Sequence, residues 1–249
     1  MIVIKSAPQI EVMRKAGKIV AKTHELLERH IKPGIKTITL DRIAEDFIRS
    51  CGAIPSFKGY KGYPASINVS VNSEIIHGIP SSLKTLKNGD IVGIDIGVCY
   101  KGYHGDAART YGIGHITDED KKLILAARGS FFEAIKFAKP KMHLNQICTA
   151  IQDHVESHGF SVVREFIGHG IGKDLHEMPN IPNYRMKKRG PRLDKGMTLA
   201  IEPMVNMGTH ELVVLEDGWT AVTMDGKNSA HYENTVLITD GEPEILTLL

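Results

Sequence analysis

The sequence predicts an α+β fold made of two similar halves that pack as one body. Helix-like and strand-like segments follow one another in the same order twice along the 249 residues. Matched residues in the two sets lie 107 positions apart, and no Gly-, Ser- or Pro-rich linker separates the sets. A chain of this length forms one large domain or two small ones. We therefore expect a single domain over residues 1–249, with an internal repeat of about 6–110 and 111–249.

Two helices open the first half. Ser6, with Gln9 three residues later, is a capping-box pattern, and apolar residues then recur at helical spacing as far as Leu27. Thr39 is the expected start of a second helix, which Gly52 terminates. Both helices have one apolar face, so we expect them to cover a sheet.

Strands complete the first half. Residues 67–71 alternate between apolar and polar side chains, which is typical of a half-buried strand. Residues 91–96 are nearly all apolar, as in a strand that is buried on both faces. A tight turn near residues 100–102 would let the chain pair back, so that Asp106 lies beside Asp95.

The second half repeats this order. Thr117 opens a helix that ends at Lys139-Pro140, and a helix over residues 147–155 ends at Gly159. Strands are expected at Val162–Phe166, Thr198–Val205, Leu212–Leu215 and Thr235–Ile238. The offset of 107 residues relates Lys32-Pro33 to Lys139-Pro140, Ser50 to Ser157, Gly52 to Gly159, Gly89 to Gly196 and Asp95 to Glu202. A duplicated half explains this offset better than chance does.

The composition excludes several classes of protein. The 31 basic and 29 acidic residues give a net charge of only +2, which argues against a protein that binds DNA through bulk charge. Three scattered cysteines, Cys51, Cys99 and Cys148, favour a reducing compartment over a disulfide framework. No apolar run resembles a signal peptide or a membrane span. We expect a cytoplasmic protein with no membrane partner, and a monomer by default.

Five polar residues stand out against this apolar background. Asp95 and Glu202 interrupt buried strands at matched positions of the repeat, and a carboxylate in a dry strand must be hydrogen-bonded, paired or bound to metal. Asp106 follows the predicted turn, and Glu233 precedes an apolar run at a place that loosely mirrors Asp106. His169 lies between glycines, which allow a ligand to approach closely.

Together these residues predict a metal site. Four carboxylates in one cleft would raise one another's pKa values, and two divalent cations would neutralise them. With one imidazole added, such an oxygen-rich site suits Mn, Fe, Co or Zn without selecting strongly among them. Two ions roughly 3.5–4 Å apart lower the pKa of a shared water, which is the chemistry of a hydrolase.

The same five residues, with the phrases Gly168–Gly172, Ala200–Val205 and His77–Pro80, resemble the type I methionine aminopeptidases. The resemblance runs from Ser6 to Leu248. It implies one catalytic domain with the pita-bread fold, in which two pseudo-symmetric halves surround a central antiparallel sheet. It also implies removal of the initiator methionine from nascent proteins, with preference for a small second residue.

The resemblance assigns roles to individual residues. Asp95, Asp106, His169, Glu202 and Glu233 would bind two metals, with Asp106 and Glu233 bridging. A hydroxide between the metals would attack the scissile carbonyl, with Glu202 as general base, His77 contacting substrate or moving a proton, and His176 stabilising the oxyanion. The methionine pocket would use Phe57, Tyr60, Tyr63, Asn68, His77, Leu175, His176 and Trp219, and a monovalent cation would bind near Asn72 and Ser229.

Two rival functions remain open. Proline-specific aminopeptidases and dipeptidases share the fold and ligands, but they carry an extra N-terminal domain for which we expect no room before Ser6. Non-catalytic peptide-binding relatives lose metal ligands, whereas all five are present here. The run Arg185–Arg192 is basic, so weak contact with ribosomal RNA is a further hypothesis beside the default of a solvated loop.

Overall fold

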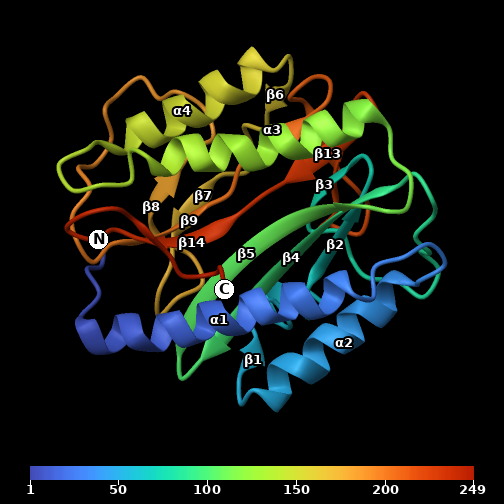
Figure 1. Ribbon diagram of the computed structural model, residues 1–249, viewed down its shortest axis with the longest axis horizontal. Helices are drawn as coiled ribbons and strands as arrows, with labels where there is room; N and C mark the ends of the chain where they lie inside the picture. Colours follow the sequence, from blue (N-terminus) through green and yellow to red (C-terminus); the bar gives the residue numbers. More distant parts are fainter.

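Helices cover the sheets on one side of the molecule in the computed structural model, which describes residues 1–249. Figure 1 shows α1 (Ala7–Glu28) and α2 (Thr37–Ser50) over the strands of the first half, and α3 (Asp118–Ile135) and α4 (Leu144–Ser157) over those of the second. None of the helices combines the length and the apolar character needed to cross a membrane.

The helices begin close to where the sequence predicts. Ser6 and Gln9 form the expected capping box of α1, and the Thr117 side chain accepts a hydrogen bond from the Asp120 N–H at 3.1 Å to cap α3. α2 begins two residues before the predicted Thr39, with Lys36 as its N-cap. Local capping chemistry is therefore sufficient to place the starts of α1 and α3, whereas α4 begins at Leu144, three residues before the expected position 147.

The first-half sheet is built around one long hairpin. β4 (Ile91–Tyr100) pairs along its whole length with β5 (Tyr103–Gly112), and the turn between them has positive φ at Lys101 and Gly102, as predicted. β1 (Ile54–Pro55) and β2 (Asn68–Val71) also pair with β4, and the 3-10 helix η1 (Tyr60–Gly62) lies between them in the chain. Asp95 and Asp106 thus lie on adjacent strands.

The second half distributes its strands over three sheets. A five-stranded sheet contains β7 (Gly168–Gly170), β8 (Glu177–Ile181), β9 (Thr198–Ile201), β14 (Asn234–Leu237) and β15 (Glu244–Ile245). A second contains β6 (Ser161–Val162), β10 (Met204–Asn206) and β13 (Ser229–His231). A third joins β11 (Leu212–Val214) and β12 (Ala221–Thr223) to the first-half strand β3 (Glu74–Ile76).

Two predicted strands differ from the observed ones. The strand expected at Val162–Phe166 ends at Val162. The strand expected at Thr198–Val205 is divided into β9 and β10 by Glu202 and Pro203. Proline has no N–H to donate to a ladder, so the interruption at Pro203 has a local cause.

Backbone pairing follows the offset of 107 residues. Ile54 pairs with Cys99 in the first half, and Ser161 pairs with Asn206 in the second, so both partners shift by the same amount. The isolated bridges Lys36–Thr85 and His143–Arg192 are related in the same way. The repeated segments therefore share their register as well as their order.

The register corrects one expectation about this repeat. Asp106 pairs with Gly97 on β4, and the residue that pairs with the matched position, Met204 on β10, is His231. His231 rather than Glu233 is thus the counterpart of Asp106. Glu233 lies two residues further on, between β13 and β14. The sequence comparison of the two halves contained no strand pairing, so it could not show this displacement.

Each half has its own apolar core, and a smaller cluster joins them. The first-half core lies between α1, α2 and β4, and the second-half core lies between α3, α4 and β9. The joining cluster includes Phe57 and Tyr63 from the first half and Leu175 from the second. These residues form the floor of a cavity at the seam between the halves.

Candidate active site

A cavity of about 170 Å³ opens where the two half-sheets meet. It is lined by every residue predicted to bind metal, take part in catalysis or form the methionine pocket, and by Lys61 in addition. The lining residues are Phe57, Tyr60, Lys61, Tyr63, Asn68, His77, Asp95, Asp106, His169, Leu175, His176, Glu202, Trp219 and Glu233.

The first-half carboxylates are placed by the β4–β5 hairpin. Asn68 on β2 pairs with Asp95 on β4, and its amide Nδ2 donates a 2.7 Å hydrogen bond to Asp95 Oδ2. Asp106 pairs with Gly97, two residues along β4 from Asp95. Because residues two apart on a strand point to the same side, both carboxylates face the cavity.

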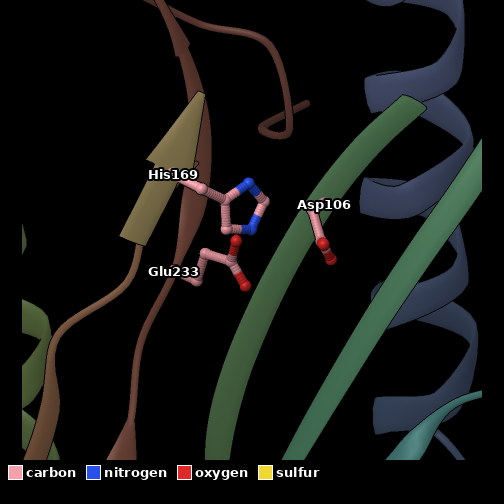
Figure 2. A group of neighbouring side chains, drawn as sticks. All are labelled: Asp106, His169 and Glu233. Atoms are coloured by element: carbon pink, nitrogen blue, oxygen red, sulfur yellow. The ribbon is translucent and has the colours of Figure 1, made fainter. Parts of the chain in front are cut away.

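The second half supplies His169 and Glu233. Ligand atoms of Asp106, His169 and Glu233 lie within 4.8 Å of one another, and Figure 2 shows the three side chains on three separate segments. His169 Nδ1 lies 2.8 Å from the Gly170 carbonyl oxygen, which can only accept, so Nδ1 carries the hydrogen and Nε2 keeps its lone pair. Glu202 Oε1 lies 3.4 Å from that Nε2.

Glycines on either side of His169 let neighbouring strands approach closely. A Cβ at Gly168 would overlap the Ala200 carbonyl oxygen, and a Cβ at Gly170 would overlap the Met178 carbonyl oxygen. β7 therefore carries a single side chain into the cavity, held between β8 and β9.

Burial makes the charged form of the acids unfavourable. It raises the pKa of Asp95 to about 6, although the Asn68 hydrogen bond acts in the opposite direction. It raises the pKa values of Asp106, Glu202 and Glu233 well above their usual range, and neighbouring carboxylates add to this. Burial, reinforced by His176, lowers the pKa of His169 to about 3, so its imidazole is neutral.

The donor set fits a divalent cation. Asp95 Oδ1, Asp106 Oδ1 and Glu233 Oε1 are buried and have no hydrogen-bond partner in the protein. A buried, unpartnered carboxylate oxygen is costly, and a cation is the group that would satisfy several of them together. Neutral imidazole with carboxylate oxygens is also an ordinary ligand set for first-row divalent metals.

Two further histidines border the acids. Tyr60 Oη lies 2.9 Å from His176 Nδ1, and the His176 ring packs against that of His169 with a centroid distance of 4.2 Å. His77 has a left-handed backbone, with φ of 59°, which is uncommon for a residue with a side chain. Burial lowers the pKa values of both His77 and His176 to about 4.

Other predicted positions lie outside the cavity, and one lining residue was not predicted. Ser229 N–H donates a 2.9 Å hydrogen bond to the Asn72 carbonyl oxygen, so the two residues predicted near a monovalent cation are neighbours away from the acids. Lys61 was missed because a lone lysine in a turn has no distinctive pattern. It has a φ of 48° within η1 and lines the cavity.

Known proteins resemble this chain over nearly its whole length. Residues 11–240 match the model of metallopeptidase family M24. A methionine aminopeptidase of Clostridium perfringens is 56% identical over 249 residues, which is all of both chains. The crystal structure of the Thermotoga maritima methionine aminopeptidase superposes with a TM-score of 0.98 at 46% identity, again over all of both chains.

A more distant structural match shows the fold alone. The prolidase from Pyrococcus furiosus has a TM-score of 0.82 at 24% identity, covering 99% of this chain and 66% of the prolidase. The expected pita-bread fold is thereby confirmed. The family match over most of the chain and the high identity over its full length show that the chain belongs to metallopeptidase family M24, among the methionine aminopeptidases.

Proposed function

We propose that this metallopeptidase removes N-terminal methionine from nascent polypeptides with two divalent cations held by Asp95, Asp106, His169, Glu202 and Glu233. The observation that carries the proposal is the set of three buried carboxylate oxygens without protein partners, on Asp95, Asp106 and Glu233. Four carboxylates and a neutral imidazole balance the charge of two such ions, for which Mn, Fe, Co and Zn are candidates. Bound there, the cations would polarise the scissile carbonyl and activate water.

The surrounding side chains have distinct proposed roles. Glu202 takes the proton of the attacking water, because its carboxylate lies among the other ligands and close to His169. His176 donates to the carbonyl oxygen as negative charge develops there. Its Nδ1 is engaged by the Tyr60 hydroxyl, which leaves Nε2 for the substrate. His77, neutral at pH 7, contacts the leaving side of the peptide.

The apolar wall of the cavity suits a methionine side chain. Phe57, Tyr63 and Leu175 are buried, and the Trp219 ring meets the Tyr63 ring edge-on with a centroid distance of 5.1 Å. Thioether sulfur makes favourable contacts with aromatic rings, and an unbranched side chain fits a narrow pocket. Asn68 is committed to Asp95, so it shapes the pocket near the acids.

A direct comparison of substrates tests this function. Metal-free protein reloaded with one metal at a time should cleave Met-Ala-Ser and leave Xaa-Pro dipeptides nearly untouched. Faster turnover of the Xaa-Pro substrates with every metal would transfer the chain to the proline-specific branch of its fold. No turnover of either substrate, despite bound metal, would favour a peptide-binding role.

Further proposals concern the whole molecule. We propose that the chain acts as a single catalytic domain, because each half contributes part of the cavity lining. Three free cysteines favour a cytoplasmic location. A monomer and a monovalent cation near Asn72 and Ser229 are consistent with the same proposal. Sedimentation equilibrium would test the first of these two, and potassium-dependent thermal stability the second.

The basic loop around Lys187, Lys188 and Arg189 is a proposed contact with ribosomal RNA. These side chains are exposed and form no ion pair. The loop is held on the start of α4, where Met186 N–H donates to Asn145 Oδ1 at 2.6 Å. Neutralising the three cations should weaken salt-sensitive cosedimentation with ribosomes. Neutralising Lys15, Lys18 and Lys22 on α1 is the matched control, and equal losses from both triple variants would remove the proposal.

A further inference from the structure

The outer edge of β5 is satisfied by groups from the second half. β5 pairs with β4 on one side only, and on the other side alternate residues find separate partners. His104 N–H donates to the Gly172 carbonyl oxygen at 2.8 Å, and the Ala108 carbonyl oxygen accepts from Glu233 N–H at 3.0 Å. Asp106 lies between His104 and Ala108, and no strand pairs with its main-chain N–H and carbonyl groups on this side.

One side chain takes the place of the missing strand. Thr235 Oγ1 accepts a 2.9 Å hydrogen bond from Asp106 N–H and donates a 2.9 Å hydrogen bond to the Asp106 carbonyl oxygen. We name this pair of bonds a threonine clasp. The Thr235 side chain is fully buried, so water cannot replace either bond.

The same clasp occurs a second time across the seam. Thr110 Oγ1 on β5 accepts from His231 N–H and donates to the His231 carbonyl oxygen, both at 2.9 Å. His231 is the counterpart of Asp106 in the repeat, because Gly97 and Met204 occupy matched positions opposite them. Each half therefore holds one residue of the other half through a threonine hydroxyl.

We propose that Thr235 is a positioning residue that sets the place of Asp106 in the metal site, an inference that rests on the proposed role of Asp106 as a ligand. Asp106 Oδ1 has no hydrogen-bond partner in the protein, so the main-chain position of Asp106 contributes directly to where this oxygen lies. Thr235 is itself anchored, since it pairs with Ala200 on β9 and its carbonyl oxygen accepts from Leu246 N–H at 2.9 Å. The clasp thus ties a first-half ligand to the second-half sheet.

The second clasp provides a matched control. Thr110 holds His231, which is not a proposed ligand. Glu233, two residues further on, is held without Thr110, because its N–H bonds to the Ala108 carbonyl oxygen and its own carbonyl oxygen accepts from the Arg109 guanidinium. Loss of the Thr110 hydroxyl should therefore reduce stability without moving a ligand.

The test is calorimetric titration of Co²⁺ alone into metal-free Thr235→Val and Thr110→Val, with the melting temperature of each. Both variants should melt at lower temperature. Thr235→Val should bind Co²⁺ about 10–100-fold more weakly, as is common when a ligand loses its support. Thr110→Val should keep the affinity of the unmodified protein, and Thr235→Ser, which retains the hydroxyl, should restore it.

Equal Co²⁺ affinity in Thr235→Val and the unmodified protein would overturn the inference, as would equal weakening in both valine variants. Asp106→Asn separates the two levels of proposal: if it binds Co²⁺ normally, the metal site itself is wrongly assigned. If Thr235→Val does not fold, Thr247→Val is the variant that tests the inference. It removes the hydroxyl that accepts from Thr235 N–H at 3.2 Å and donates to Asn234 Oδ1 at 2.9 Å, and unchanged Co²⁺ affinity there would also count against the inference.

Discussion

The two halves of the molecule share a framework but differ where the chemistry occurs. In the first half β4 runs unbroken for 10 residues and turns tightly into β5. In the second half the matching strand is broken at Glu202 and Pro203, and residues 207–228 separate β10 from β13. That longer connection carries Trp219 to the cavity. The second half is thus less regular than the first, and its irregular connection contributes a side chain to the proposed substrate pocket.

Only one pair of proposed ligands occupies matched positions. Asp95 and Glu202 are related by the 107-residue offset, whereas His231 stands opposite the position of Asp106. The counterpart of His169 is Ser70, because these residues pair with Ala200 and Gly93, which are also 107 residues apart. The two halves therefore share their strand pairing, but Asp106 and His169 each have a counterpart of another residue type, so most of the proposed ligand set is not repeated.

The largest expected difference between the halves is in how much activity is lost when Asp106 or its counterpart His231 is replaced. Asp106→Asn should lower kcat/KM at least about a thousandfold, because metal catalysis contributes several kcal/mol to the barrier. His231→Gln, at the matched position, should retain Co²⁺ binding and most activity. Assays of both variants with a Met-Ala-Ser substrate check this. Comparable losses would show that the two positions have not diverged in function.

A second difference is how closely helices approach the chain beneath them. In α1 a Cβ at Gly17 would overlap the main chain of Leu246, whereas in α3 a Cβ at Gly129 would meet only the end of the His154 side chain. Gly17→Ala should therefore cost about 1–3 kcal/mol of unfolding free energy through overpacking. Gly129→Ala should be neutral or stabilising by up to about 1 kcal/mol. Urea unfolding midpoints measure both, and equal shifts would contradict the close packing of α1.

The difference that is smallest near neutral pH is in pH dependence, and it grows as the pH falls. His24 in α1 is buried with Nε2 2.9 Å from the Ala107 carbonyl oxygen, and burial lowers its pKa to about 3. Phe131 lies at the matched position of α3 and cannot titrate. Below pH of about 6.5 the unfolded chain protonates His24 and the folded one does not, so stability falls as pH decreases towards 3.

Replacing His24 should remove this contribution. His24→Gln should lower the dependence of unfolding free energy on pH by up to about 1.4 kcal/mol per pH unit between roughly pH 6 and 4. Denaturant unfolding of the metal-free protein at several pH values measures the slope. A slope identical to that of the unmodified protein would mean that His24 is protonated in the fold.

Local signals in the sequence predicted more than non-local ones. Capping residues such as Ser6 and Thr117 fixed helix starts, because their hydrogen bonds are made within one turn. The five proposed metal ligands were predicted from their places in the sequence, whereas the pocket residues and both histidines were predicted only by resemblance to the type I methionine aminopeptidases. Lys61 was not predicted, and most contacts among the cavity residues were not. The hydrogen bond between Tyr60 and His176 joins residues 116 apart, and no local pattern encodes it. The assignment of His231, rather than Glu233, as the counterpart of Asp106 likewise depends on non-local strand pairing.

The placement of Asp106, His169 and Glu233 on opposite sides of the seam has a consequence for how the molecule unfolds. A cation held by all three would act as a cross-link between two bodies that each have their own apolar core. Binding would stabilise the joined state by mass action and make the two cores melt together. Chelation would remove the cross-link, so the loss of metal should appear first as a loss of cooperativity between the halves.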